Sequence, residues 1–285
     1  MSKKDIAYFD ELWASSFPKD GMRHTKETWD RLAEDWRSSP SEVQAQKDVM
    51  CGEIARYALA RGIINKDSLV ADIGCGSGNY AVEFAKLAGH VTCSDISTRM
   101  LELCRELIAE QGLHNVDYVD CDFLAFDVEK AGWLKKYDLV FTSLTPAMSG
   151  LASVEKVNRI SRGWCFNNSF IYRKDFLRNE VMEKAFGLPP RDKFDGSSTY
   201  CLFNILWQLG YMPEIRYYKE QTLHDYELDM GLCKRIASMI IRDREPSEEE
   251  VQTTYKYLEE NFAVDGKVKK ATESLFAWTY WYVGE

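Results

Sequence analysis

Short apolar segments alternate with helix-length amphipathic segments through the middle of the chain, from about residue 68 to residue 172. Parallel neighbours in a sheet need a crossover connection, so this alternation predicts βαβ units and a mainly parallel sheet. Strands are expected at 68–74, 90–96, 116–122, 137–144 and 163–172, and helices at 79–88, 97–112 and 151–162. The second of these helices opens at Ser97, which is a suitable N-cap residue.

A helical period replaces the alternation before this region. The segment 5–17 is helix-like, and a second helix is expected after Thr25, whose side chain can cap it. The sequence "SPSE" at 39–42 has a capping-box pattern with proline at the first helical position. A third helix should therefore run from there to about Ala60.

The chain after residue 172 returns to helices and two late strands. Segments 174–187 and 198–210 are helix-like, and 211–220 is expected to be a sixth strand. Residues 222–262 are predicted to form two helices, the second capped by Ser247 with Glu250 three residues later. The final aromatic run, 275–283, has strand character.

These elements predict an α/β fold with a doubly wound sheet and helical additions. The expected segments are an N-terminal helical lid at 1–45, an α/β core at 46–221, a helical cap insertion at 222–262 and a last core strand at 263–285.

Composition excludes several classes of protein. The 285 residues are 45% hydrophobic and 28% charged, as in an ordinary globular domain. No apolar stretch is long enough to cross a bilayer and the start of the chain lacks the apolar region of a signal peptide, so we expect a cytoplasmic protein without a membrane partner. The net charge of −9 disfavours a nucleic-acid substrate, because the overall field repels phosphate backbones.

The eight cysteines show no CxxC pair and no zinc-type spacing. Cys93, Cys121 and Cys165 fall in apolar strand-like runs, where a thiol is a small buried hydrophobe. We therefore expect no metal, although a trio of thiolates that binds a soft metal or metalloid stays an open alternative.

The segment "VADIGCGSGNY", residues 70–80, places three glycines between a strand and a helix. Glycines at 74, 76 and 78 allow positive φ and let backbone approach a ligand closely. The dinucleotide fingerprint requires G-x-G-x-x-G, and here the third glycine comes one position early. Asp95 ends the next strand, where its carboxylate can accept hydrogen bonds from ribose hydroxyls. Asp122 follows the third strand, where it can accept from an exocyclic amine, with Phe123 beside the ring.

"VADIGCGSG", "CSDIS", "DCDFLAFD" and "YDLVFTSLT", in this order, resemble the successive motifs of class I S-adenosylmethionine-dependent methyltransferases. The resemblance covers roughly residues 45–170. It implies S-adenosylmethionine as cofactor and a seven-stranded sheet whose last strand is antiparallel and lies between the fifth and sixth. The implied cofactor residues are Asp72, Gly74, Cys75 and Gly76 at the methionine part, Asp95 and Ile96 at the ribose, Asp122 and Phe123 at the adenine, and Ser143 and Leu144 near the sulfonium. Within that loop, Cys75 itself is expected to pack and not to act as a nucleophile.

The methyl acceptor is less well defined by the sequence. The [D/N]PP[Y/F] motif of many DNA and some protein N-methyltransferases is absent; "SLTPAM" occupies its place, which disfavours amide-like and base-amine acceptors. Aromatic residues of the covering segments could contact substrate or pack inside, and two histidines there are candidate general bases. These candidates are Tyr8, Trp13, Trp29 and Trp36, with Thr145 after the fourth strand, and His24 and His224 as bases.

The sequence leaves four candidate functions. The leading one is a methyltransferase that acts on O, N, S or C of a small molecule, by in-line displacement that mainly requires alignment. A methyltransferase for protein or RNA is the alternative. An NAD(P)-linked oxidoreductase is opposed by the early third glycine, and a cofactor-binding protein without catalysis is the fourth. The oligomeric state is left open.

Overall fold

The computed structural model describes residues 5–16, 25–37, 41–190, 193–194, 196–241 and 244–284, without the side chains of 34–48 and 193–194. The chain divides into two compact units. Unit 1 comprises Met1–Ser169, Ser197–Arg216 and Ala277–Glu285, and unit 2 comprises Phe170–Gly196 and Tyr217–Phe276. None of the described helices is both long and apolar enough to span a membrane.

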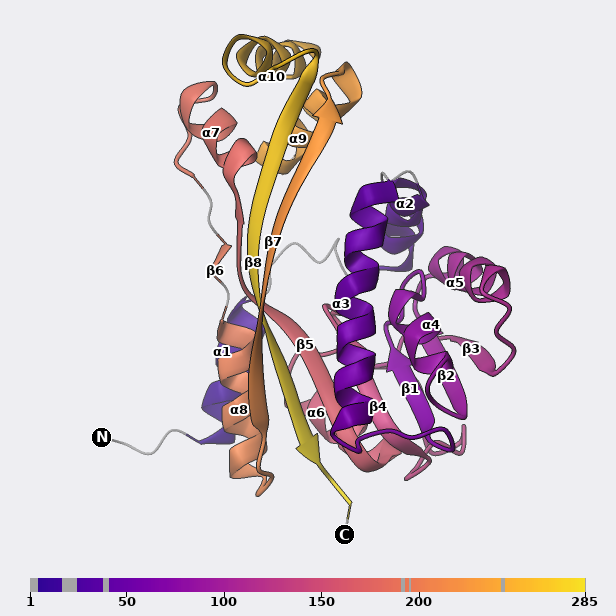
Figure 1. Cartoon of the computed structure of the whole chain (residues 1–285). Helices are drawn as coiled ribbons and strands as arrows, with labels where there is room; N and C mark the ends of the chain where they lie inside the picture. Colours follow the sequence, from indigo (N-terminus) through magenta and orange to yellow (C-terminus); the bar gives the residue numbers. More distant parts are fainter. Residues whose placement is uncertain are drawn as a thin grey trace. The chain divides into compact units, whose positions relative to one another are not determined.

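The first five strands form the parallel part of one sheet (Figure 1). The strand order is β3-β2-β1-β4-β5-β8-β7. Strands β1 to β3 are added in one direction and the later strands in the other, so the strand order reverses between β1 and β4. Ligands of open α/β sheets bind at such a switch point, beyond the carboxyl ends of the strands. The five strands are β1 (Leu69–Ile73), β2 (His90–Asp95), β3 (Val116–Asp120), β4 (Tyr137–Ser143) and β5 (Ser161–Asp175).

Residues of each strand alternate between two covered faces, as a doubly wound sheet requires. Ala71 and Val140 belong to a core with α1, α6 and α8, whereas Phe141 on the other face contacts Phe84 of α4, with ring centroids 4.9 Å apart. Helices α3, α4 and α5 pack in sequence on that second face. The helices of unit 1 are α1 (Ile6–Ser16), α2 (Lys26–Arg37), α3 (Ser41–Ala60), α4 (Asn79–Ala85), α5 (Thr98–Glu110), α6 (Leu151–Ile160) and α8 (Ser197–Gln208).

Strand β8 lies between β5 and β7, which confirms the expected position of the last strand. These strands are β7 (Glu214–Glu227) and β8 (Lys267–Tyr282). Along unit 2 they run in opposite directions (Figure 1). A short eighth strand, β6 (Lys193–Phe194), pairs antiparallel with β5 off this seven-strand path. The fold is therefore the predicted seven-stranded, mostly parallel sheet with flanking helices.

Unit 2 has its own apolar core, which α7 (Phe176–Lys184), α9 (Met230–Ile240) and α10 (Glu248–Asn261) build. The division differs here from the expected segments 46–221 and 222–262, because Leu177, Val181 and Met182 of α7 pack with α9 and α10. The expected cap also begins too early at residue 222. Residues up to Glu227 continue β7, with partly buried positions every second residue.

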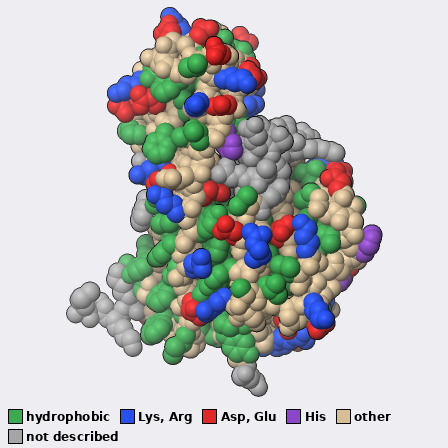
Figure 2. Space-filling view, in the orientation of Figure 1, with side chains coloured by type: hydrophobic (Ala, Val, Ile, Leu, Met, Phe, Trp, Pro, Cys, Tyr) green, Lys and Arg blue, Asp and Glu red, His purple; other side chains and the backbone are tan. Residues whose placement is uncertain are grey.

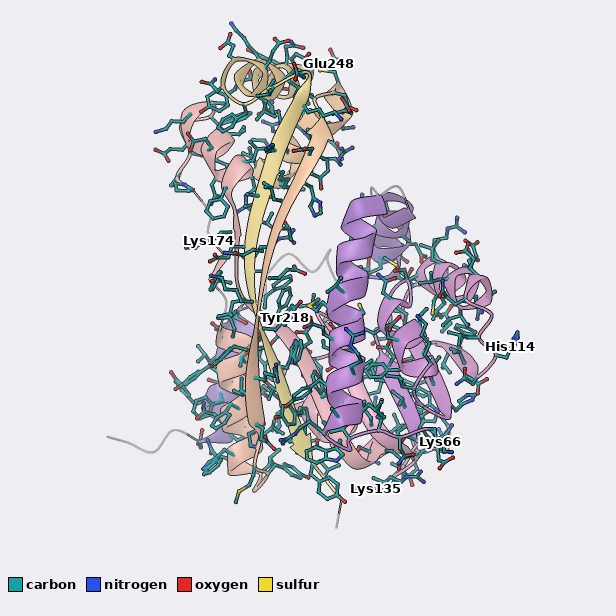
Figure 3. All side chains as sticks on the ribbon, viewed as in Figure 1. Lys66, His114, Lys135, Lys174, Tyr218 and Glu248 are labelled. Atoms are coloured by element: carbon teal, nitrogen blue, oxygen red, sulfur yellow. The ribbon has the colours of Figure 1, made fainter. Side chains whose placement is uncertain are left out.

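Three helices begin at the N-cap residues that the sequence predicted. The Thr25 and Ser97 side chains accept from the backbone N–H groups of Thr28 and Met100, at 3.3 and 3.0 Å, which starts α2 and α5. Ser247 and Glu250 form a reciprocal capping box on α10, whose start is labelled in Figure 3 at Glu248. These contacts confirm three predicted helix starts.

Candidate functional site

The loop that joins β1 to α4 has three glycines with left-handed backbone. Gly74, Gly76 and Gly78 have φ values of +70°, +54° and +88°. The N–H groups of Gly74 and Cys75 donate to the carbonyl of Ser94 at 2.7 and 3.0 Å, which fastens the loop to the end of β2. The backbone is therefore held in a conformation that residues other than glycine adopt at a cost.

The surroundings of the three glycines differ. A Cβ added to Gly74 would collide with the Thr145 side chain, and one added to Gly78 would collide with the Cys104 sulfur. A Cβ added to Gly76 would meet no atom within 4 Å. The space beside Gly76 is thus open, as the expected approach of a ligand requires.

Asp95, at the carboxyl end of β2, is bound to this loop. One carboxylate oxygen accepts from Gly76 N and the other from Ser97 N, each at 2.9 Å. Burial raises the pKa of Asp95, while these backbone N–H groups act in the opposite direction. A carboxylate offers about four lone-pair sites, so two remain for a ligand such as a ribose diol.

Asp72 is almost completely buried in β1, with 1% of its surface exposed. Its Oδ2 atom has no hydrogen-bond partner among the described residues, and burial raises the pKa of its carboxyl well above the ordinary value. An unpaired buried carboxylate is costly, so a cationic or N–H-bearing ligand group would stabilise it. The α-ammonium of S-adenosylmethionine has this chemistry. The buried Asp72 carboxylate therefore fits that cofactor.

The two residues expected at the adenine differ in exposure. Asp122 is exposed, and its Oδ1 accepts from Leu124 N at 3.0 Å in a local turn. Phe123 is only 4% exposed and belongs to the core of unit 1, with Lys156 Nζ 5.3 Å from its ring centroid. Asp122 is therefore open to a ligand, whereas most of the Phe123 ring is covered.

A polar cluster at the end of β4 and on the neighbouring part of β5 was only partly anticipated. The side-chain amide of the fully buried Asn168 donates to Ser143 Oγ at 3.0 Å and to Tyr80 Oη at 3.2 Å. Its own oxygen has no partner among the described atoms, and burial raises the pKa of Tyr80 well above its usual range. Sequence reasoning named Ser143 and missed the other two: Tyr80 ends the glycine segment 70–80 without being singled out there, and Asn168 lies inside a strand outside the quoted motifs.

The turn after β4 leads from this cluster to the glycine loop. Leu144 has a φ of +51° and is 42% exposed. Thr145 packs against Gly74, as the collision of an added Cβ shows. The turn after β4 therefore brings Thr145 to the β1 loop.

Helix α2 covers the same edge of the sheet and supplies contacts that no sequence signal predicted. Lys26 Nζ donates to the Ile96 carbonyl at 3.3 Å and lies 3.1 Å from Asp120 Oδ2. Asp30 Oδ1 accepts from Ser97 Oγ at 2.6 Å. These bonds hold α2 at the ends of β2 and β3, beside Asp95.

The aromatic candidates are mostly packed. Trp13 is 1% exposed within the unit 1 core, and Trp29 packs against Ala33, Met100 and Leu103. Tyr8 is 37% exposed and contacts Phe9. The packed-face alternative therefore describes Trp13 and Trp29, while Tyr8 is partly exposed.

One of the two histidine candidates, His224, lies in the part of the chain that the structure describes. His224 lies on β7 of unit 2, on a strand where a helix was expected, and contacts Tyr226. His24 and the side chain of Trp36 lie outside the described residues. His114, expected in a turn, is exposed between α5 and β3 (Figure 3).

Three cysteines meet behind the glycine loop, a grouping that the sequence did not indicate. The sulfur atoms of Cys75, Cys93 and Cys104 lie within 4.8 Å of one another. Hydrogen bonds from the other two thiols lower the pKa of Cys104. Cys121 and Cys165 take no part in the group.

Comparisons with known proteins agree with this geometry. Residues 70–160 match the family model described as "Methyltransferase domain". Human EEF1A lysine methyltransferase 2 is 28% identical over 202 residues, which cover 65% of this chain and 85% of that protein. The 23S rRNA (uracil(1939)-C(5))-methyltransferase RlmD of Shewanella sediminis is 33% identical over 87 residues, but these span only 30% of this chain and 19% of RlmD.

Among solved structures, magnesium protoporphyrin IX methyltransferase of Synechocystis PCC 6803 superposes with a TM-score of 0.50 at 15% identity, covering 88% of this chain and 96% of that one. That likeness shows the fold. The ordered motifs, the open space at Gly76 and the family match together identify residues 70–160 as a methyltransferase domain of the class I, S-adenosylmethionine-dependent type.

Proposed function

We propose that this protein transfers the methyl group of S-adenosylmethionine to a small-molecule acceptor, at an O, N, S or C atom. The cofactor supplies an electrophilic methyl group on a positively charged sulfur. The observation that carries the proposal is the neutral polar cluster of Tyr80, Ser143 and Asn168 beside the β1 loop.

This cluster is suited to orienting an acceptor and not to deprotonating it. Asn168 fixes both hydroxyls by donation, and the raised pKa of Tyr80 keeps its hydroxyl protonated at neutral pH. The side-chain oxygen of Asn168 has no partner among the described atoms, so it can accept one hydrogen bond from an N–H or O–H group of the methyl acceptor. Alignment of a nucleophile alone can supply about 7–11 kcal/mol of a reaction barrier.

We assign the cofactor contacts within the same proposal. Asp72 would bind the ammonium group, the backbone at Gly74, Cys75 and Gly76 the methionine chain, and Asp95 the ribose hydroxyls. Ile96 and Asp122 would lie along the nucleoside, and residues 1–45 would act as a lid, which the bonds of Lys26 and Asp30 support.

A protein lysine acceptor is the second candidate, because the match to EEF1A lysine methyltransferase 2 extends over 202 residues. Against an RNA acceptor stands the overall charge. The chain carries a net charge of −9, and on the face shown in Figure 2 the described basic and acidic side chains are interspersed. In favour of an RNA acceptor stand partial matches to several RlmD proteins, which span at most 26% of those proteins.

The test begins with binding. Calorimetry should show that S-adenosylhomocysteine binds and NAD does not, and that Asp95→Ala weakens binding by at least tenfold. The control is Asp117→Ala, an exposed carboxylate that pairs with His90 at 2.9 Å on β3. Binding of NAD in place of S-adenosylhomocysteine would contradict the cofactor assignment.

The acceptor class is tested with radiolabelled S-adenosylmethionine and a cell extract divided by size. We expect label to enter the small-molecule fraction. Label that enters only protein or RNA would overturn the small-molecule proposal, and binding without any transfer would indicate a cofactor-binding protein without catalysis.

A further inference from the structure

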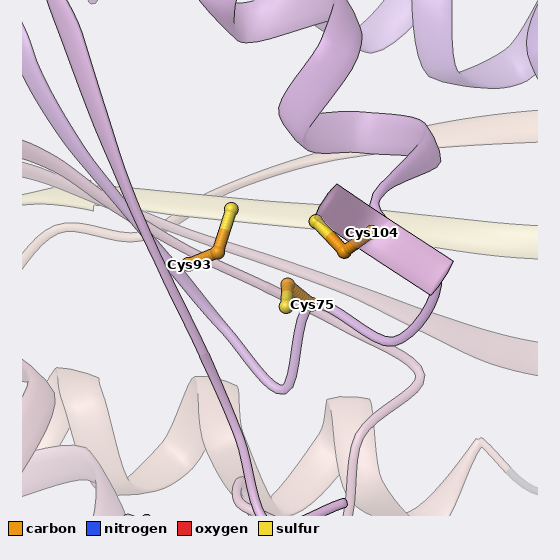
Figure 4. Close-up of side chains that lie close together, drawn as sticks. All are labelled: Cys75, Cys93 and Cys104. Atoms are coloured by element: carbon orange, nitrogen blue, oxygen red, sulfur yellow. The ribbon is translucent and has the colours of Figure 1, made fainter. Parts of the chain in front are cut away.

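Cys75, Cys93 and Cys104 come from three different elements, and their side chains lie close together (Figure 4). Cys75 lies in the β1 loop, Cys93 in β2 and Cys104 in α5. All three are free thiols and buried, with exposed fractions of 7%, 0% and 0%. Among the described residues, this is the one group of three or more histidine, cysteine or acidic side chains close enough to share an ion.

The backbone around the thiols makes room for them. A side chain at position 78 would collide with the Cys104 sulfur, so Gly78 leaves that space to the thiol. The Cys75 sulfur is placed by the left-handed turn between Gly74 and Gly76, whose N–H contacts attach it to β2. The same turn that leaves open space at Gly76 thus places the Cys75 sulfur within reach of the other two.

Sulfur spacing favours a bound ion over a disulfide. A metal–sulfur bond of about 2.3 Å puts the sulfurs of a trigonal site about 4 Å apart, so sulfurs within 4.8 Å need to move by roughly 1 Å or less. A disulfide requires about 2.05 Å between two sulfurs and leaves the third unused.

We propose that Cys75, Cys93 and Cys104 form a three-sulfur binding site for a soft monovalent cation of the Cu(I) type. Thiolate ligands select soft cations of this kind. Structural zinc sites almost always have four ligands, whereas Cu(I) accepts three sulfurs in a trigonal arrangement. A bound ion connects the β1 loop, β2 and α5, and this role goes beyond methyl transfer.

The site is tested on the full chain, reduced and freed of metal under anaerobic conditions. Cu(I) is titrated against a colorimetric chelator. We expect one ion per chain and a higher melting temperature, because an ion that binds the folded state stabilises it. Cys104→Ala should weaken binding by at least 100-fold. Cys165→Ala removes an equally buried thiol from β5, outside the group, and should change binding by less than threefold.

X-ray absorption at the copper edge of the wild-type protein keeps the test independent of whether a variant folds. Three sulfur neighbours support the site; a shell of nitrogen or oxygen, or two sulfurs, overturns it. Unchanged Cu(I) affinity in Cys104→Ala also overturns it. S-adenosylhomocysteine binding is measured on the same metal-free sample, so failure of the proposed function is distinguishable from failure of this site.

Discussion

The three glycines of the β1 loop meet three different requirements at the scale of single residues. Gly74 makes room for Thr145 and Gly78 for Cys104, so both are needed for packing inside the protein. Gly76 has no such neighbour, and its N–H is occupied by Asp95. The pattern G-x-G-x-G therefore combines two packing glycines with one that lies beside open space.

Gly76→Ala is predicted to weaken cofactor binding in addition to lowering the stability of the protein. The left-handed backbone should cost about 1–2 kcal/mol in folding free energy, and the new methyl group should also enter the cofactor space. We expect at least a tenfold loss of S-adenosylhomocysteine affinity by calorimetry. Gly112→Ala has a similar φ of +65° and open surroundings in the loop after α5, so it should lose stability alone. Equal affinities in the two variants would contradict this assignment.

Asp72→Asn is predicted to stabilise the ligand-free protein near neutral pH while weakening cofactor binding. Burial raises the pKa of Asp72, so its contribution to stability is favourable at low pH and is lost as the pH rises through the folded-state pKa. The variant removes that dependence. A charge-assisted bond of about 1.5–3 kcal/mol would also disappear, which corresponds to roughly 10- to 150-fold in affinity.

Thermal unfolding from pH 5 to pH 8 checks the predicted change in stability. Calorimetry checks the predicted loss of cofactor affinity. The wild-type protein should lose stability relative to Asp72→Asn as the pH rises. A variant that is less stable than the wild type at every pH would show that the carboxylate has a partner in the free protein.

At the scale of elements, periodicity predicted the strands and helices between 68 and 172 because each has a simple pattern and a clear start. The same reasoning misjudged residues 222–227, where "TLHDYE" continues β7 with only partial burial at alternate positions. It also assigned α7 to the core, since Leu177 and Val181 show an apolar face without showing its partner. Contacts between distant elements, such as the Cys75, Cys93 and Cys104 group or the Asn168 cluster, have no local signature.

Asn168→Ala is predicted to reduce turnover by at least tenfold and to leave S-adenosylhomocysteine affinity within threefold. The substitution removes the donor that fixes Ser143 and Tyr80 across β4 and α4. Asn167→Ala is the matched control: it is the adjacent buried residue of β5, and its Oδ1 accepts from Thr142 Oγ1 at 2.8 Å. Equal turnover in the two variants, measured by methyl transfer, would remove Asn168 from the acceptor site.

Ser247→Ala is predicted to destabilise α10 locally. The capping box is lost when the hydroxyl that accepts from Glu250 N is removed, at a cost of about 0.5–2 kcal/mol. Hydrogen exchange should speed up over residues 248–261. Thr253→Ala, whose hydroxyl donates to the Glu249 carbonyl in the middle of the same helix, should change exchange far less. Comparable effects would mean that the cap does not limit the opening of α10.

At the scale of the whole molecule, each unit is closed by its own apolar core, and the chain passes between them along β5, β7 and β8. Every proposed cofactor contact lies in unit 1, from Asp72 to Ser143. Cofactor binding should therefore stabilise unit 1 directly. Unit 2 contributes no residue to that set, although it contains the candidate base His224.

S-adenosylhomocysteine at 100 times its dissociation constant should stabilise unit 1 by about 2.7 kcal/mol, because a ligand that binds only the folded state adds RT ln(1 + [L]/Kd). Hydrogen exchange with mass spectrometry should then show slower exchange in residues 70–80 and 93–97, and unchanged exchange in α9 and α10. Since unit 2 has a separate core, this protection should end along the three connecting strands. Equal protection of α9 and α10 would instead show that the two cores open as one cooperative unit, and the cofactor's stabilisation would then be shared by the entire chain.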